Sequence, residues 1–251
     1  DDLHASCALR LIEAGKHVLV ERPLATRLED AEQVVRSARR RGVALMVNFT
    51  HRWNPKFLAA HDALRSRRLG TPLSALVRLN QSSLVPTELT PWAARCGLVW
   101  HTLPRAIDLL RWLLLEEVRE VYAVGTRGHL PGVPPDPWDA LHVLLRFEQT
   151  VATVETNWLL PSSWPWLSQY ALTLRGSHGT IEVDAIDNGI VLAAERFEYP
   201  QPMLRYVKHG LLEGLQLEPI QDFVECVLEG REPRSGGEDG LAATVVAAAV
   251  E

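Results

Sequence analysis

The first fifty residues alternate between helical patterns and short apolar runs. Apolar residues recur at helical spacing over residues 4–15 and 28–42, and each segment ends in a glycine. Between and after them, residues 17–21 (HVLVE) and 43–49 (VALMVNF) are mostly apolar runs, which predict buried strands. Helix, strand, helix and strand in this order are typical of a parallel sheet covered by helices.

The pattern changes after a predicted helix over residues 54–70. Strand-like stretches separated by turn residues then follow, at residues 72–83, 118–127, 139–160 and 170–195. Short strands divided by tight turns predict a sheet that is mostly antiparallel. We therefore place a domain boundary near residue 70, with domains over residues 1–70 and 71–251.

Other segments of the second domain predict helices and a loop. The expected helices cover residues 102–115, 218–230 and, after the cap GGEDG, 241–250. Residues 127–138 contain four prolines and predict a loop. Trp92 and Arg95 precede the first of these helices in what we expect to be another loop.

Composition and charge narrow the class of protein. The chain has 251 residues, 47% hydrophobic and 23% charged, with a net charge of -5, which is typical of a globular protein and disfavours nucleic acid as a partner. No apolar run reaches about 18 residues and no signal pattern is present, so we expect no membrane partner and a cytoplasmic location. The three cysteines lie far apart in sequence, so we expect neither a disulfide framework nor a metal site.

Five segments in this order resemble the glucose-fructose oxidoreductase, inositol dehydrogenase and MocA (Gfo/Idh/MocA) family of NAD(P)-dependent oxidoreductases. They are residues 1–25, 39–57, 97–114, 174–184 and 222–249. The resemblance implies a fold class of α/β plus α+β: the C-terminal part of a Rossmann parallel sheet, followed by a domain with a large, mostly antiparallel sheet and helices on one face. It also implies that the last helix packs back on the Rossmann part.

The resemblance further implies a cofactor, NAD or NADP, and association into a homodimer or homotetramer through the large sheet. Residue 1 would then follow the fourth Rossmann strand. No G-x-G-x-x-G occurs in the 251 residues, so the main dinucleotide-binding motif is absent from them. We expect this sequence to be part of a longer protein.

The end of the first predicted strand, Glu21-Arg22-Pro23, is the first candidate site. From the residues alone it could be only a polar strand terminus with a proline stop. The family pattern at this place is E-K-P, whose lysine lies between nicotinamide and substrate, and here the lysine is replaced by Arg22. Because arginine stays protonated in proteins, Arg22 can bind but should not transfer a proton. Pro23 is a candidate for a cis peptide bond.

The second family motif, D-x-G-x-H-x-x-D, aligns on Asp108 and places His101, Leu103 and Arg105 at its other defined positions. The usual acid is replaced by His101 and the usual histidine by Arg105. His101 is the residue of this set that could move a proton readily, since histidine titrates near neutral pH. A helix-start histidine bonded to backbone is the alternative. We take His101, Arg22 and Arg105 as catalytic candidates, and two arginines near a substrate favour a carboxylate or phosphate.

Further candidates follow from the resemblance. Expected at the cofactor are Glu21, Arg22, Pro23, Asn48 and Arg52; expected at the substrate are His51, Asn54, Trp92, Arg95 and Trp158. Helix capping explains Asn54 equally well, since Pro55 follows it. Trp158, with Trp164 and Trp166, could equally belong to the core or to an interface, and Asp108 is more readily structural than catalytic.

The sequence therefore predicts an enzyme that transfers hydride between nicotinamide and a hydroxyl or carbonyl of a sugar, polyol or acidic sugar-like substrate. Two alternatives stay open, because the E-K-P lysine and the motif histidine are both arginine here. One is a catalytically impaired NAD(P)-binding sensor or regulator of the same fold. The other is a non-dehydrogenase enzyme on the same scaffold.

Overall fold

The N-terminal part consists of two helices and two parallel strands. The computed structural model describes residues 1–251 except 129, 131–137, 194–196 and 202. Along the chain it begins with α1 (His4–Glu13), β1 (Val18–Glu21), α2 (Leu28–Arg41) and β2 (Leu45–Asn48). The strands pair in parallel from Val18 opposite Leu45 to Glu21 opposite Asn48. This confirms the predicted pattern, and it places the carboxyl ends of both strands side by side.

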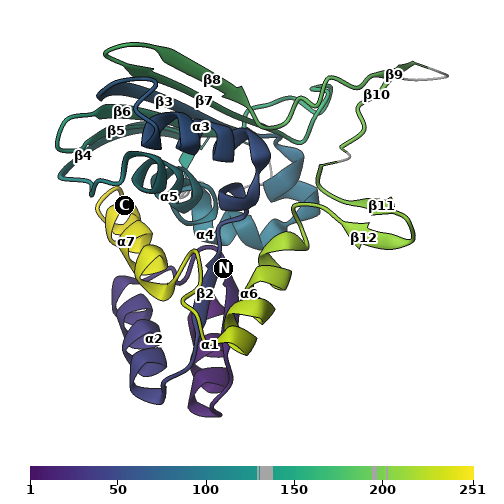
Figure 1. The fold of residues 1–251 in the computed structure, drawn as a ribbon. Helices are drawn as coiled ribbons and strands as arrows, with labels where there is room; N and C mark the ends of the chain where they lie inside the picture. Colours follow the sequence, from purple (N-terminus) through teal and green to yellow (C-terminus); the bar gives the residue numbers. More distant parts are fainter. Residues whose placement is uncertain (129, 131–137, 194–196, 202) are drawn as a thin grey trace.

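A six-stranded sheet dominates the rest of the molecule (Figure 1). Its strands lie in the order β4-β5-β6-β3-β7-β8, all antiparallel to their neighbours except for the parallel pair β3 and β6. Their bounds are β3 (Pro72–Gln81), β4 (Glu120–Arg127), β5 (Trp138–Arg146), β6 (Val151–Asn157), β7 (Ser168–Gly176) and β8 (Thr180–Asp184). The mostly antiparallel sheet is therefore confirmed.

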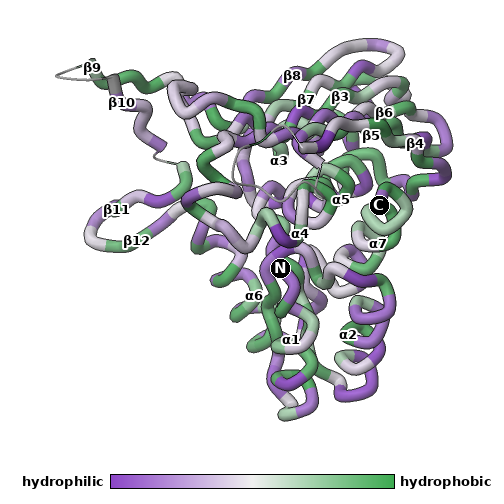
Figure 2. Tube along the Cα trace, turned by 180° about the vertical axis from the view of Figure 1, so that it is seen from behind, coloured by the Kyte–Doolittle hydropathy of each residue, from purple (hydrophilic) through white to green (hydrophobic). Residues whose placement is uncertain are grey.

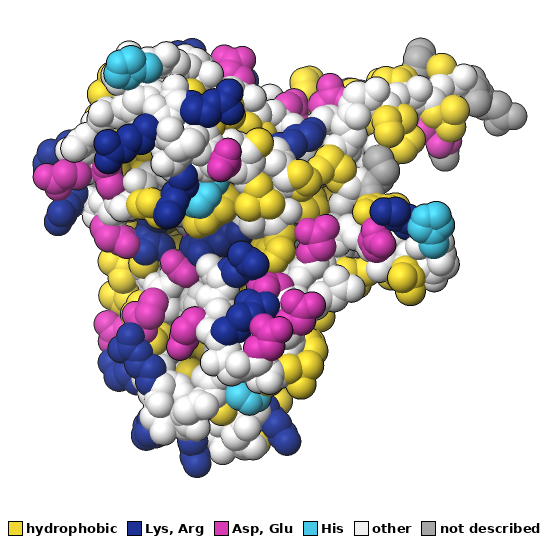
Figure 3. Space-filling model, in the orientation of Figure 1, with side chains coloured by type: hydrophobic (Ala, Val, Ile, Leu, Met, Phe, Trp, Pro, Cys, Tyr) yellow, Lys and Arg dark blue, Asp and Glu magenta, His cyan; other side chains and the backbone are white. Residues whose placement is uncertain are grey.

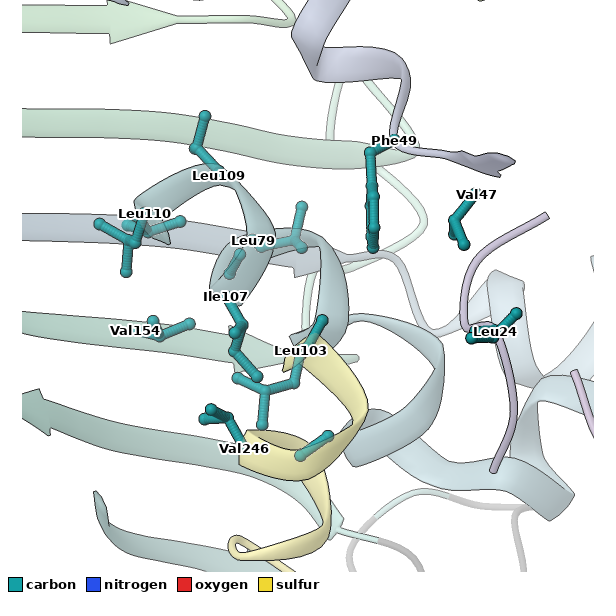
Figure 4. Packing of buried hydrophobic residues seen from close by; sticks show 14 of the residues in the cluster. Leu24, Val47, Phe49, Leu79, Leu103, Ile107, Leu109, Leu110, Val154 and Val246 are labelled. Carbon is teal, nitrogen blue, oxygen red and sulfur yellow. The ribbon is translucent and has the colours of Figure 1, made fainter. Parts of the chain in front are cut away.

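Helices cover one face of this sheet, as predicted (Figure 1). They are η1 (Thr50–Trp53), α3 (Pro55–Arg65), η2 (Val85–Leu89), α4 (Pro91–His101) and α5 (Leu103–Leu114). The buried side chains of β5 alternate along the strand and face these helices. Helix α5 carries Leu103, Ile107 and Leu110 into the core, where they lie between the sheet and α7 (Gly237–Ala248) (Figure 4).

Helix α4 corrects the prediction of a loop around Trp92 and Arg95. Proline and glycine in this stretch indicate a loop when the sequence is considered alone. In the structure Pro91 occupies the first turn, where its missing N–H breaks no helical bond. Gly97, with φ of 74° and ψ of 172°, is not helical and divides α4 into two helical segments across a kink.

The chain ends in α6 (Glu218–Glu229) and α7, both predicted, but α7 begins four residues earlier than expected. The prediction took GGEDG as a cap before the helix. Instead Gly236 is the N-cap, and its N–H donates to the Asp239 carboxylate at 3.0 Å, so the acidic residues form the first turn. Helix α7 packs against α2, β2 and α5. A Cβ on Gly240 would lie 2.6 Å from Cγ2 of Val47, so only glycine permits this close approach.

Two short hairpins project from the body beside the large sheet (Figures 1 and 3). They are formed by β9 (Leu192–Ala193) with β10 (Phe197–Glu198), and by β11 (Tyr206–Lys208) with β12 (Leu211–Glu213). In Figure 2 the helices of the N-terminal part show mixed hydrophilic and hydrophobic colours, as amphipathic helices should. The predicted loop over residues 127–138 lies largely outside the described residues.

Among the described residues, no helix is both long enough and apolar enough to cross a membrane.

Candidate functional site

A cavity of about 480 Å³ opens beside the carboxyl ends of β1 and β2. Glu21 and Asn48, the last residues of these strands, both line it. Its other walls come from η1, from Arg105 on α5, from Tyr170 on β7, and from the segments that lead into and out of the two hairpins. Ligands of open α/β sheets bind outside the carboxyl ends of parallel strands, so this position is the expected one.

Buried polar atoms without a hydrogen-bond partner gather at this cavity. Among the described residues eight such side-chain atoms occur, and five of them belong to cavity-lining residues: Asn48 Oδ1, His51 Nδ1, Tyr170 Oη, Asn188 Oδ1 and Gln201 Nε2. Leaving a buried polar group unpaired costs about 1 to 3 kcal/mol. Their concentration around one cavity indicates a site where a polar ligand supplies the missing partners.

Two arginines place positive charge next to the cavity. Arg105 lines it, and its guanidinium lies 5.8 Å from the centre of the Tyr170 ring, with no hydrogen bond or ion pair to any described residue. Burial lowers the pKa of Arg105. Burial, and then the charge of Arg105, lower the pKa of Arg22 to about 9, so Arg22 is a cation at neutral pH. Arginine side chains in general stay protonated in proteins, and we take Arg105 as a cation for that reason. Arg105 is therefore a partly buried cation that forms no ion pair with a described residue, and the only acidic side chain that lines the same described cavity, Glu21, acts on it without direct contact.

Arg22 is held at the end of β1 by a hydrogen bond to the last residue of α4. Its Nη1 donates to the backbone oxygen of His101. The Arg22–Pro23 peptide bond is cis, as predicted. Neither Arg22 nor Pro23 lines the cavity directly, whereas Glu21 does, and the Asn48 side-chain N–H donates to the Glu21 carboxylate at 2.6 Å.

His101 does not line the cavity. Its pKa also differs from the sequence expectation, which was a histidine that titrates near neutral pH. Its Nδ1 lies 3.1 Å from the Asp1 carboxylate, and its ring packs edge-on against Trp92. Burial, and then the charges of Arg22 and Arg105, lower the pKa of His101 to about 3. A group with so low a pKa is a poor general base for the hydroxyl proton of an alcohol.

Asp108 is the centre of a buried hydrogen-bonded network. It is fully buried and accepts from Arg52 at 2.9 and 2.6 Å and from His51 Nε2 at 2.9 Å. Burial acts to raise the pKa of Asp108, but the hydrogen bonds from His51 and Arg52 hold it below its usual value. Arg52 also pairs with Asp239 at 3.0 Å and donates to the Arg234 backbone oxygen at 2.5 Å. These bonds hold the Arg52 guanidinium within the protein, and Arg52 does not line the cavity.

The remaining candidates divide between the cavity and the fold. Asn54 lines the cavity, and its side-chain oxygen also accepts from the Lys56 N–H at 2.9 Å, which makes it the N-cap of α3. Trp158 is fully buried and donates to the Gln81 side chain at 3.1 Å, so it belongs to the core. Arg95 is exposed and lies 3.6 Å from the Asp2 carboxylate. The structure thus brings together Glu21, Asn48, His51, Asn54 and Arg105.

Sequence reasoning missed Tyr170, Asn188 and Gln201. Tyr170 is on β7, more than sixty residues beyond Arg105, and the other two lie in irregular segments around the hairpins. No motif in the sequence marks them, because only the packing of the sheet against the N-terminal part brings them to the cavity. In the described part of the chain, no group of three metal-ligating side chains occurs.

Comparisons with known proteins identify the family of the chain. A family model described as the GFO/IDH/MocA C-terminal domain matches residues 57–182, which is half of the chain. A second model, described as an oxidoreductase family with an NAD-binding Rossmann fold, matches residues 1–49. The chain belongs to the Gfo/Idh/MocA family. By family it is an NAD(P)-dependent oxidoreductase.

Individual relatives of this Gfo/Idh/MocA chain include enzymes of sugars and polyols. An inositol 2-dehydrogenase of Acidothermus cellulolyticus is 30% identical over 244 residues, which are 96% of this chain and 68% of the relative. A probable dehydrogenase from Thermotoga maritima has a TM-score of 0.81 at 22% identity over 99% of this chain and 74% of its own. The WlbA dehydrogenase from Bordetella pertussis, in complex with NADH and UDP-GlcNAcA, has a TM-score of 0.76 and is 22% identical in sequence. The match covers 99% of this chain and 72% of the WlbA chain.

The residues at the strand ends fit a nicotinamide cofactor in part. The unpaired Asn48 Oδ1 and the adjoining Glu21 carboxylate are acceptors of the kind that a carboxamide N–H needs. When bound, the nicotinamide supplies a hydride acceptor or donor. The 251 residues hold no glycine-rich fingerprint, so we assign none of them to the pyrophosphate.

Proposed function

We propose that this Gfo/Idh/MocA chain acts on a sugar-like or polyol substrate that carries an anionic group, interconverting a hydroxyl and a carbonyl with NAD or NADP. Residues 1–70 would form the Rossmann part and residues 71–251 the substrate domain. The observation that carries the proposal is Arg105, a cation that forms no ion pair with a described residue and lines a cavity with several unpaired polar atoms.

Charge and hydrogen-bonding capacity set the substrate class. A carboxylate or phosphate near Arg105 would compensate a guanidinium that is already partly removed from water. The Asn188 side-chain N–H donates to the Gln201 side-chain oxygen at 2.8 Å, which leaves Asn188 Oδ1 and Gln201 Nε2 unpaired. They are an acceptor and a donor of the kind that sugar hydroxyls bind. The relatives are named for inositol and for a complex with UDP-GlcNAcA, and both substances carry several hydroxyls. We propose neither a nucleic acid nor a membrane as a partner.

A cofactor-binding sensor is the second candidate function. It is favoured by one observation, the presence of arginine at two positions where the family has titratable groups. Turnover distinguishes the two functions. We expect the protein to reduce NAD⁺ or NADP⁺ with at least one member of a panel of myo-inositol, D-glucose, D-glucuronate and D-gluconate. Binding of panel compounds without any absorbance change at 340 nm would favour the sensor.

Replacing Arg105 by methionine should weaken the binding of acidic substrates more than that of neutral ones. Loss of a charge-assisted hydrogen bond costs about 1.5 to 3 kcal/mol, so KM for D-glucuronate should rise roughly 10- to 100-fold. KM for a neutral sugar should change less than about threefold, because it makes no such bond. Arg65→Met, on an exposed position of α3, is the matched control. An equal rise in KM for acidic and neutral sugars would contradict the proposal that the substrate carries an anionic group.

We further propose that two copies associate through the outer face of the large sheet. This face carries exposed apolar side chains on neighbouring strands, with Tyr122 paired opposite Leu144 and with Val124 and Val151 nearby. A contiguous apolar patch on a sheet typically marks a protein partner. Tyr122→Glu should therefore shift the species seen by size-exclusion chromatography with light scattering toward the monomer. Lys208→Glu, on a projecting hairpin, should leave it unchanged.

A further inference from the structure

We propose that His51, oriented by Asp108, is the group that accepts the hydroxyl proton of the substrate when it is oxidised. The proposal rests on the proposed function of the cavity, and it names the residue that performs one step there. His101, the sequence candidate for this step, lies outside the cavity wall. His51 is the one histidine on that wall in the part of the chain that the structure describes.

The network around Asp108 decides which nitrogen of His51 carries the proton. Asp108 accepts two hydrogen bonds from Arg52 and is held as a carboxylate, which can only accept. His51 Nε2, 2.9 Å from Asp108 Oδ2, must therefore be the N–H donor. In the neutral ring, Nδ1 is then left with its lone pair available.

This lone pair is unused within the protein. Nδ1 of His51 is buried and has no hydrogen-bond partner, and the residue lines the cavity. The ring is held from several sides, by Phe49 at 5.8 Å, Phe57 at 6.3 Å and Trp112 at 6.2 Å between ring centres. A histidine that donates to a buried carboxylate and keeps its other nitrogen free has the arrangement of a general base.

The surrounding charges suit the role. Burial lowers the pKa of His51, and the hydrogen bond and charge of Asp108 act to raise it. The other charged groups that face the ring are Arg52 on η1 and Arg105 on α5, and both disfavour the imidazolium. His51 is consequently neutral at neutral pH and able to accept a proton, and Asp108 stabilises the imidazolium once it forms.

In the direction of oxidation, a C–H bond and an O–H bond of the substrate break. The C–H bond of the substrate carbinol breaks and its hydrogen leaves as hydride to the oxidised nicotinamide of NAD⁺ or NADP⁺. The O–H bond breaks, its proton joins Nδ1 of His51, and the carbonyl forms. The imidazolium then loses that proton to water through the mouth of the cavity, so one CH–OH group is oxidised, one nicotinamide is reduced and one proton is released.

The first test compares His51→Gln with wild type. Glutamine can still donate to Asp108 but cannot titrate, so kcat should fall roughly 10²- to 10⁴-fold. Wild-type kcat/KM should decline as the pH falls through the pKa of His51, and the variant should lack that decline. His61→Gln, whose ring stacks on Trp112 outside the cavity wall, is the matched control and should keep kcat within about twofold. An unchanged rate and pH profile in His51→Gln would refute the role.

His101→Gln is measured beside it as the competing assignment. If His101→Gln lowers kcat more than His51→Gln does, and also removes the decline of kcat/KM at low pH, the role returns to His101 and the proposal is overturned. A second readout does not need turnover. In ¹⁵N spectra of the free protein, the His51 signals, assigned by their absence in His51→Gln, should show a protonated Nε2 and an unprotonated Nδ1, and D-glucuronate should shift the Nδ1 signal.

The two readouts separate the proposals. If wild type turns over no panel compound, the proposed function fails, and the ¹⁵N signals still decide whether His51 offers Nδ1 to a ligand. If Nδ1 is protonated in the free protein, or if D-glucuronate binds without moving its signal, the assignment of His51 fails whatever the activity.

Discussion

Replacing Asp108 by asparagine is expected to lower the free energy of unfolding by about 3 to 5 kcal/mol. Asp108 is fully buried between Arg52 and His51, and removing its charge leaves the Arg52 guanidinium with only its weaker partners inside the protein. Urea unfolding followed by circular dichroism measures the change. Glu32→Gln, which breaks the exposed pair of Glu32 with Arg36 on α2, is the control and should change the same quantity by less than about 0.5 kcal/mol.

The same variant has an expected dependence on pH. The pKa of Asp108 is lower in the folded protein than its ordinary value of 3.8. Its contribution to stability is therefore fully present above about pH 4 to 5, and it is lost as the pH falls through the lower folded value. The stability difference between wild type and Asp108→Asn should shrink on acidification. A difference that grows toward low pH, or one below about 1 kcal/mol at pH 7, would contradict the network as described.

Trp158→Ala is expected to destabilise the protein by about 3 to 5 kcal/mol and to leave substrate preference unchanged. The Trp158 side chain is fully buried and its indole N–H donates to Gln81, so its removal creates a cavity and an unpaired polar group. Urea unfolding gives the free energy, and KM for D-glucuronate and D-glucose is measured at a temperature where the variant is folded.

Trp164 offers the matched control, since it follows the same strand but is 39% exposed. Trp164→Ala should cost less than about 1 kcal/mol. If Trp158→Ala does not fold, Trp158→Phe should fold with a smaller loss, because most of the ring volume remains. A near-normal stability with a changed ratio of KM values would show that Trp158 contacts substrate after all.

Local patterns were sufficient for most of the elements. Helices α1, α2, α3, α5 and α6 lie within the predicted segments. The strands of the large sheet do so as well, except that β5 begins one residue and β7 two residues before the predicted start. Each of these elements buries one face whose apolar spacing is visible in the sequence. Helix α4 was not predicted, because Pro91 and Gly97 resemble loop residues until their places in the first turn and at the kink are known. The early start of α7 was missed for a similar reason, since an acidic first turn resembles a cap.

The candidate site was predictable only in part. Glu21 and Asn48 follow from the end of each parallel strand, where the chain must leave the sheet. Tyr170 lies on a strand whose pattern shows only alternate burial, and nothing in that pattern distinguishes a phenol at a ligand site from one in the core. His51 and Asp108 are 57 residues apart, so their hydrogen bond could not be inferred from spacing.

The sequence alone therefore determined most of the elements, the family resemblance and the two arginine replacements, because these depend on residue type and short-range periodicity. Only the tertiary structure decided which side chains share the cavity. It placed His101 Nδ1 3.1 Å from the Asp1 carboxylate and buried Arg52 and Trp158. It also left Nδ1 of His51, a residue that lines the cavity, without a hydrogen-bond partner. Those outcomes depend on how the large sheet packs against the strand ends, where contacts join residues far apart in the chain.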